Sequence, residues 1–83
     1  MPDFGTMPIS WRGGHALDRC LERGFDPAEV ERAIRGNNVT GQRQDGRWEI
    51  YACIGGQMTL VVVAVVRDMV VPVTVYGRGI TCS

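Results

Sequence analysis

The sequence predicts an α+β domain in which two N-terminal helices pack on a four-stranded antiparallel meander sheet, in the order ααββββ. Apolar residues recur at helical spacing in the first part of the chain and alternate with polar ones after Asn37-Asn38. Three hairpin signals, at Asp45-Gly46, Gly55-Gly56 and Arg67-Asp68, divide the second part into four strands. Turns this short join antiparallel neighbours, and a chain of 83 residues has room for one small domain.

Residues 1–13 form a leader without a sustained hydrophobic period, because prolines and glycines interrupt it. We expect an irregular arm or a short extra strand there, and we place a single α+β domain at residues 14–83. Trp11 of this arm either closes the edge of the core or belongs to a surface for a partner. We expect removal of residues 1–10 to matter less than changes in the domain, unless the arm carries Trp11 into a partner.

Both predicted helices have recognisable ends. The first covers residues 15–23, after which Gly24 supplies a C-terminal stop. The second begins with Asp26 as the N-cap residue and Pro27 at the first helical position, and it runs to about Arg35. Ala16, Leu17, Cys20 and Leu21 follow helical spacing in the first helix, and Val30, Ala33 and Ile34 give the second helix a buried stripe.

The strands differ in their patterns. Residues 47–54 alternate, with Trp48, Ile50, Ala52 and Ile54 on a packed face and Arg47, Glu49, Tyr51 and Cys53 on the other. Residues 58–66 are apolar at nearly every position, which favours a central strand covered on both sides. Residues 70–76 carry Pro72, which cannot donate a ladder hydrogen bond and indicates an edge strand or a bulge. Unbroken alternation places Thr74 and Tyr76 on one face with Val70 and Pro72, opposite Val71, Val73 and Val75.

The formal net charge is zero, which argues against indiscriminate binding to nucleic acid. All nine cationic residues are arginines, whose planar guanidinium groups bind phosphate or carboxylate in a bidentate manner. A G+C-rich coding sequence explains the same bias, so the arginines by themselves do not identify a ligand. Clustered arginines can still form a local basic patch.

The three cysteines, Cys20, Cys53 and Cys82, form no CxxC pair and lie at no metal-ligand spacing with histidine. We therefore expect reduced thiols in a cytoplasmic protein, with no disulfide framework, metal site or cofactor. Residues 1–10 lack the features of a signal peptide, and the apolar run at residues 58–66 is too short to span a bilayer as a helix. These observations predict a soluble chain without a membrane partner.

The densest candidate site lies at the start of the first predicted helix, where the only histidine, His15, precedes Arg19 by one turn. Imidazole has an ordinary pKa near neutrality, and a guanidinium four residues later projects from the same side of a helix. This pairing joins a proton carrier to a group that binds oxyanions, which suits cleavage of a phosphodiester. The alternative is that His15 lies at a helix terminus and Arg19 is a solvated surface charge.

Several short motifs fall in the order and spacing of one family and cover roughly residues 14–78. They are His15-Ala16, Arg19, Arg23-Gly24, Glu29-Val30, Gly36, Asp45-Gly46-Arg47, Leu60-Val61-Val62-Val63 and Val73-Thr74-Val75-Tyr76. On these residues the chain resembles the bacterial domain of unknown function (DUF) 4258 family. That family is similar to the RelE-like toxins and to the wider barnase, EndoU, colicin and RelE (BECR) fold group. The resemblance implies helices followed by a curved four-stranded antiparallel sheet, and a metal-independent endoribonuclease without a cofactor.

The resemblance also implies that His15, Arg19, Thr74 and Tyr76 carry the reaction, in which a 2′-hydroxyl attacks the neighbouring phosphate. Such cleavage needs a base for the hydroxyl proton, an acid for the leaving 5′-oxygen, and donors around the phosphorane. His15 would be the base or the acid, Arg19 would hold the phosphate, and the two strand hydroxyls would donate hydrogen bonds. The second acid–base role falls to Glu49, to Tyr76 or to water, since the chain has a single histidine.

Four further residues are candidates for substrate binding: Arg12, Arg47, Tyr51 and Arg78. An arginine and a tyrosine on the polar face of one strand can contact an RNA backbone and stack on a base. Arg78 follows the last strand closely enough to reach the site at its end. Ordinary alternatives apply to each, namely a solvated sheet face for Arg47 and Tyr51, and good strand-forming residues for Thr74 and Tyr76.

The implied partners are RNA, either transfer RNA or messenger RNA on the ribosome, and an antitoxin or immunity protein that covers His15 and Arg19. A toxin of this class acts in the cytoplasm, including that of a target cell into which it is delivered. Two other interpretations stay open. The chain is then either a non-catalytic protein-interaction module, whose edge strand at Pro72 pairs with a partner, or an inactive relative of the toxin fold.

Overall fold

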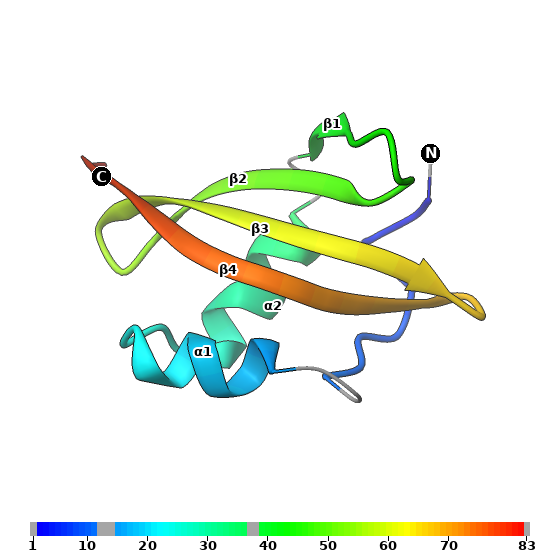
Figure 1. Ribbon diagram of the computed structural model, residues 1–83, viewed down its shortest axis with the longest axis horizontal. Coiled ribbons are helices and arrows are strands. Elements are labelled where there is room, and N and C mark those ends of the chain that lie inside the picture. The colour runs from blue at the N-terminus through cyan, green and yellow to red at the C-terminus, as the bar shows by residue number, and fades with distance from the viewer. Residues whose placement is uncertain (1, 12–14, 37–38, 83) are drawn as a thin grey trace.

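The sheet is an antiparallel meander whose strands lie side by side in chain order. The computed structural model describes residues 2–11, 15–36 and 39–82. Over these residues the chain forms helices α1 (Ala16–Glu22) and α2 (Pro27–Arg35), then strands β1 (Val39–Gln42), β2 (Trp48–Ile54), β3 (Gln57–Val66) and β4 (Met69–Thr81). The two helices and the four-stranded sheet of this described part confirm the predicted α+β class and the order of its elements (Figure 1).

Local hydrogen bonds set the ends of the helices where the sequence predicts them. Asp26 is the N-cap of α2, and its carboxylate accepts a 2.9 Å hydrogen bond from the backbone N–H of Ala28. After α1, Gly24 adopts a φ of 79°, and the N–H of Phe25 donates to the carbonyl of Cys20. This is a Schellman ending, which needs a residue that tolerates positive φ. It turns the chain so that the Phe25 ring enters the core.

A hydrophobic core lies between the helices and one face of the sheet, here called the inner face. Figure 1 shows α2 crossing behind the sheet, while α1 runs along β4, against which it packs. Trp48 and Ala52 pack against this core, so the predicted division of the β2 side chains is confirmed. The buried members from helices and sheet are Cys20, Phe25, Val30, Ile34, Ile50, Ile54, Val61, Val63, Val70 and Val75.

The interior strand β3 is buried from both sides. Val61 and Val63 belong to the core, whereas Leu60 and Val62 point to the opposite face of the sheet and are each only 1% exposed. The prediction of a central strand covered on both sides is therefore confirmed. On the face without the core, side chains of the neighbouring strands provide the cover, since strand side chains stand beside their cross-strand partners.

The edge strand β4 contains a bulge beside Pro72, which confirms the prediction of an edge strand or a bulge at this residue. Val63 of β3 pairs with Pro72, whereas the preceding Val62 pairs with Thr74. Val73 is therefore an extra residue on β4 with no partner of its own in the register. Proline lacks the N–H of a regular ladder position, so the bulge lies where the hydrogen bonding is already interrupted.

This bulge reverses the alternation of side chains along β4. Val70 before it and Val75 after it both belong to the core, although they are five positions apart. The prediction that Thr74 and Tyr76 share a face with Val70 and Pro72 is therefore wrong, because the extra residue moves every later side chain to the other face. Thr74 and Tyr76 do lie opposite Val75, on the face without the core.

The N-terminal segment belongs to the core. Phe4 is fully buried, and its ring packs edge to face on Trp48 with 6.2 Å between the centroids. Ile9 forms a parallel bridge to β4, and the Arg35 guanidinium of α2 donates to the carbonyl of Phe4. The segment is therefore part of the folded domain and not an arm outside it, whereas the effect of removing residues 1–10 stays a prediction.

Trp11 closes the edge of the core, the first of the two alternatives for this residue. It is half-buried and packs against the core, and its indole Nε1–H donates to a carboxylate oxygen of Glu31 at 3.2 Å. The apolar part of the indole is thus covered while its polar atom has a partner near the surface.

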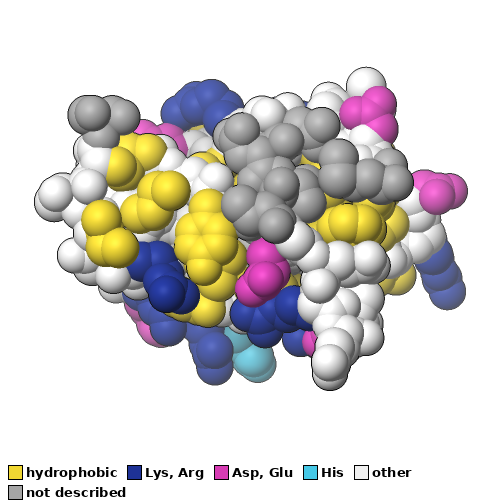
Figure 2. Space-filling model, turned by 90° about the horizontal axis from the view of Figure 1, so that it is seen from above, with side chains coloured by type: hydrophobic (Ala, Val, Ile, Leu, Met, Phe, Trp, Pro, Cys, Tyr) yellow, Lys and Arg dark blue, Asp and Glu magenta, His cyan; other side chains and the backbone are white. Residues whose placement is uncertain are grey.

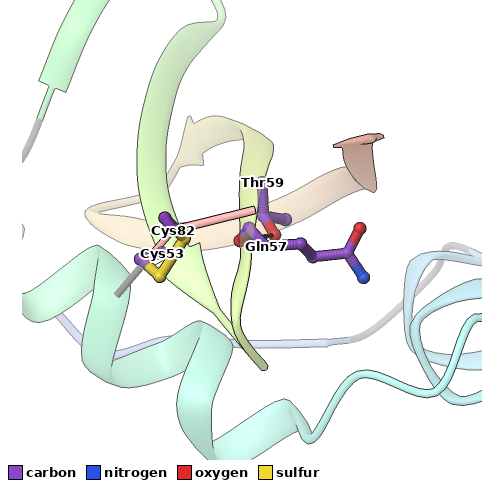
Figure 3. The surroundings of a disulfide bond; sticks show 4 residues. All are labelled: Cys53, Gln57, Thr59 and Cys82. Atoms are coloured by element: carbon purple, nitrogen blue, oxygen red, sulfur yellow. Dashed lines mark hydrogen bonds between the residues drawn. A yellow bond between two sulfur atoms is a disulfide. The ribbon is translucent and has the colours of Figure 1, made fainter. Parts of the chain in front are cut away.

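A disulfide joins Cys53 near the end of β2 to Cys82 after β4 (Figure 3). The expectation of three reduced thiols is therefore wrong. Strands separated by an intervening strand lie roughly 9–10 Å apart, but the Cα atoms of these cysteines are 5.9 Å apart. The end of β4 must therefore bend past the start of β3, where Gln57 pairs with Thr81 and the Cys82 N–H donates to the Gly56 carbonyl at 3.0 Å.

Cys20 is the free cysteine and is buried in the core. Its Sγ–H donates to the carbonyl of Phe25 at 3.5 Å. Burial, with a smaller contribution from Asp26, raises the pKa of the Cys20 thiol above its ordinary value. The expected reduced state is thus confirmed for this cysteine, which is also kept in its protonated, unreactive form.

We expect Phe4→Ala to lower the free energy of unfolding by about 3–5 kcal/mol, because it removes a fully buried ring. Urea unfolding followed by circular dichroism measures the change. The control is Leu21→Ala on α1, where the side chain is 57% exposed and the expected loss is about 0.5 kcal/mol. If Phe4→Ala costs no more than the control, the N-terminal segment is not part of the core.

We expect replacement of both Cys53 and Cys82 by serine to lower the free energy of unfolding by about 3–4 kcal/mol, because the disulfide closes a loop with a sequence separation of 29. Urea unfolding of the wild type with and without reductant should reproduce the difference. The serine variant should be insensitive to reductant. A reductant effect of equal size in the variant would contradict this account of the disulfide.

Candidate functional site

Four of the candidate site residues lie on the face of the sheet opposite the core, here called the outer face. Neither helix crosses this face in Figure 1. Its register follows from the pairing of β3 with both neighbours, which places cross-strand partners on the same side of the sheet. The outer face includes Glu49, Tyr51 and Cys53 on β2, Leu60 and Val62 on β3, and Thr74, Tyr76 and Arg78 on β4.

Two tyrosines flank the buried leucine of this face. Tyr51 of β2 and Tyr76 of β4 are the two register partners of Leu60. Both tyrosines are half-buried, so each ring covers part of the leucine and leaves part of itself exposed. The Arg78 guanidinium carbon lies 5.9 Å from the centroid of the Tyr51 ring, which is a cation–π contact across β3. Aromatic rings beside a guanidinium can stack on bases and bind phosphate.

The next row of the outer face carries a carboxylate and a hydroxyl. Glu49 and Thr74 are the register partners of Val62 on its two sides. Arg43 of the β1–β2 turn region forms a 3.2 Å ion pair with Glu49, with side chains 39% and 31% exposed. The carboxylate proposed for the second acid–base role therefore already has a cationic partner. Sequence patterns did not identify Arg43. The one indication is that Arg43 precedes the Asp45-Gly46 turn, so that a hairpin brings it beside the polar face of β2.

His15 and Arg19 lie on α1 and are both exposed. His15 is the N-cap residue of the helix, and its side chain makes no capping hydrogen bond. Ala16 and Cys20 form the buried side of the same helix. In the described part of the chain, no hydrogen bond or ion pair joins His15 or Arg19 to the outer face.

A hydrogen bond from Arg23 holds the C-terminal end of α1 against β4. The Arg23 guanidinium donates to the backbone carbonyl of Val75. His15 is the N-cap residue and Arg23 the C-cap residue, so they lie at opposite ends of the helix, about 12 Å apart along its axis. Arg19 lies between them and is exposed. Sequence patterns missed this role of Arg23, since only the packing of α1 on β4 reveals it.

The remaining arginine candidates lie apart from this arrangement. Arg12 is outside the described residues. Arg47 lies at the end of the β1–β2 turn, where its guanidinium pairs with Asp45 at 3.7 Å on an exposed part of the surface. Such a pair contributes little to stability, so Arg47 is available to a ligand only at that end of the sheet.

Charged side chains are not spread evenly over the surface. Seen from above, several arginine side chains gather along one margin of the molecule and others lie elsewhere, while acidic side chains are scattered (Figure 2). A net charge of zero is therefore compatible with a local basic margin.

Two further properties bear on the site. Among the described residues, no group of three or more histidine, cysteine or acidic side chains is placed to hold a metal ion. No helix in the described part is long and apolar enough to cross a membrane.

Comparison with family models, curated proteins and solved structures finds no match. The function is therefore inferred from the residues of the chain itself.

Proposed function

We propose that this chain is a small RelE-like toxin of the BECR type that cleaves RNA without a metal ion. The observation that carries the proposal is the outer face, where Tyr51, Tyr76 and Arg78 lie together. The exposed His15 and Arg19 lie on α1, which packs against β4. Stacking surfaces, a phosphate-binding cation and a proton carrier are the groups that this chemistry needs. The α+β architecture is of the kind that the family resemblance implies.

RNA would bind along β4, with bases on the outer face. Tyr76 offers an aromatic ring held in place by the buried Leu60 beside it, and Thr74 offers a hydroxyl two positions earlier on the same face. A ring fixed by packing loses little freedom when a base stacks on it. Single-stranded RNA suits such a surface, since its bases are free to stack on aromatic side chains.

The cleavage step is assigned to the exposed His15 and Arg19 of α1. His15 would take the proton of the 2′-hydroxyl as that oxygen attacks phosphorus and the bond to the 5′-oxygen breaks. Arg19 would stabilise the charge on the phosphorane, and the Tyr76 hydroxyl would donate a proton or a hydrogen bond from β4. The products are a 2′,3′-cyclic phosphate and a free 5′-hydroxyl.

The proposed partners follow from the same arrangement. Transfer RNA and messenger RNA on the ribosome both present single-stranded segments, and both exist in the cytoplasm where such a toxin acts. A protein that covers the exposed His15 and Arg19 would block the reaction without entering the core, which is the role of an antitoxin or immunity protein.

The structure weakens one alternative, a non-catalytic module that pairs through the edge strand at Pro72. The N–H and carbonyl of Val70 are already bonded to the N-terminal segment, at Pro8 and Ser10, each at 2.8 Å. Arg23 occupies the carbonyl of Val75 further along the same edge. These three backbone groups of β4 are therefore not available to hydrogen-bond a partner strand.

We expect His15→Ala to reduce RNA cleavage by about 10²–10⁴-fold, the usual contribution of a general acid or base. Purified protein is incubated with total bacterial RNA in a chelator, with and without reductant, and fragment ends are mapped. Fragments with 2′,3′-cyclic phosphate ends from the wild type support the proposal.

The matched control for the substitution on α1 is Arg32→Ala on α2, an exposed arginine away from β4, which should leave cleavage unchanged. Intact RNA after incubation with the wild type, also in the presence of translating ribosomes, would contradict the proposed reaction. Cleavage that persists in His15→Ala would contradict only the assignment of the site.

Two substitutions of Tyr76 distinguish RNA binding from RNA cleavage. We expect Tyr76→Ala to weaken binding of a short single-stranded RNA by about 5–150-fold, the value of one stacked base. Tyr76→Phe should retain binding, because the ring remains, and lose cleavage rate, because the hydroxyl is gone. Fluorescence anisotropy measures binding in both variants. Equal binding by Tyr76→Ala and the wild type would remove this ring from the RNA surface.

A further inference from the structure

We propose that the Cys53–Cys82 disulfide is a redox-controlled clasp that holds Arg78 over the Tyr51 ring, so that reduction opens the outer face to RNA. The inference rests on the proposed RNA-binding function and adds a form of regulation to it. Tyr51 lies two residues before one cysteine, and Arg78 lies four residues before the other. The disulfide therefore joins the two strand ends that carry the cation–π contact.

In the oxidised structure the Tyr51 ring is covered from two directions. Its strand partner Leu60 is buried beside it, and the Arg78 guanidinium stands 5.9 Å from the ring centroid. A base that stacks on the ring needs the face that the guanidinium covers. In this state the arginine competes with the ligand for one of the two tyrosines of the outer face.

The end of β4 is exposed and irregular. From Arg78 to Thr81 every residue is exposed, and Gly79 has a φ of 73°, where the register with β3 shifts. This segment is attached to the sheet through the Gln57–Thr81 pair and through the hydrogen bond from the Cys82 N–H to the Gly56 carbonyl, among other contacts. Figure 3 shows the disulfide beside this end of the sheet. Without the disulfide, this segment can leave β3 while the core stays packed.

The chemistry is ordinary thiol–disulfide exchange with a dithiol, of the kind that keeps a cytoplasm reduced. A thiolate attacks Sγ of the exposed Cys53, the bond to Cys82 breaks, and the electron pair leaves on the Cys82 sulfur, which takes a proton from water. The second thiolate of the dithiol then attacks the mixed disulfide and releases Cys53. The dithiol is oxidised and the protein gains two thiols. Cys20 stays out of the exchange because it is buried.

The test measures binding of a short single-stranded RNA by the oxidised protein and by the protein reduced with dithiothreitol, with circular dichroism as a check on the fold. Reduction should tighten binding by at least about fivefold, the lower value for one additional stacked base. The variant with both Cys53 and Cys82 replaced by serine should bind like the reduced wild type and ignore the reductant. Hydrogen exchange, without RNA, should become faster at Thr81 and Cys82 on reduction.

A second variant removes the guanidinium that covers the ring. The two redox states of Arg78→Ala should bind the RNA alike, because the Tyr51 ring is open in both. Arg67→Ala, at an exposed arginine of the β3–β4 turn, is the control for a lost charge and should keep the redox effect of the wild type. Equal binding by both redox states of the wild type, or a redox effect of wild-type size in Arg78→Ala, overturns the clasp. No RNA binding in either state overturns the proposed function and the inference that rests on it, while unchanged exchange at Thr81 and Cys82 overturns the clasp alone.

Discussion

Burial of β3 from both sides is the constraint on which the rest of the structure depends. Val61 and Val63 belong to the core on the helix side of the sheet, but Leu60 and Val62 on the outer face are almost equally buried, although neither helix crosses that face (Figure 1). The neighbouring strands must therefore contribute large side chains to that face, among them Tyr51 beside Leu60. The same rings are the ones that the proposed function assigns to base stacking, so the residues proposed to bind RNA also lie beside the buried centre of this face.

The edges of the sheet determine which surfaces remain open to partners. Along β4, the N-terminal segment bonds to Val70 and Arg23 bonds to Val75, so backbone groups that would attract another strand already have partners. The arrangement has a second effect. It fixes the C-terminal end of α1 against β4 at Val75.

Patterns within a few residues predicted the elements well. The N-cap at Asp26, the proline after it and the glycine-containing turns act through local backbone geometry, which is the same in any fold. The single extra residue at Val73 has no such local signal beyond Pro72 next to it. Because strand side chains alternate strictly, this one residue was enough to misplace Val70 relative to Thr74.

The sequence by itself determined the helices, the strands, the meander and the inward stripe of β2, because each follows from local propensity and hydrophobic period. Only the tertiary structure decided that Phe4 fills the core, that Cys53 meets Cys82 and that Arg78 lies over Tyr51. These contacts join residues far apart in the chain, and their positions depend on how β4 bends past β3. A periodic pattern in the sequence does not predict this bend, because the bend depends on how the strands pack and on the register between β3 and β4.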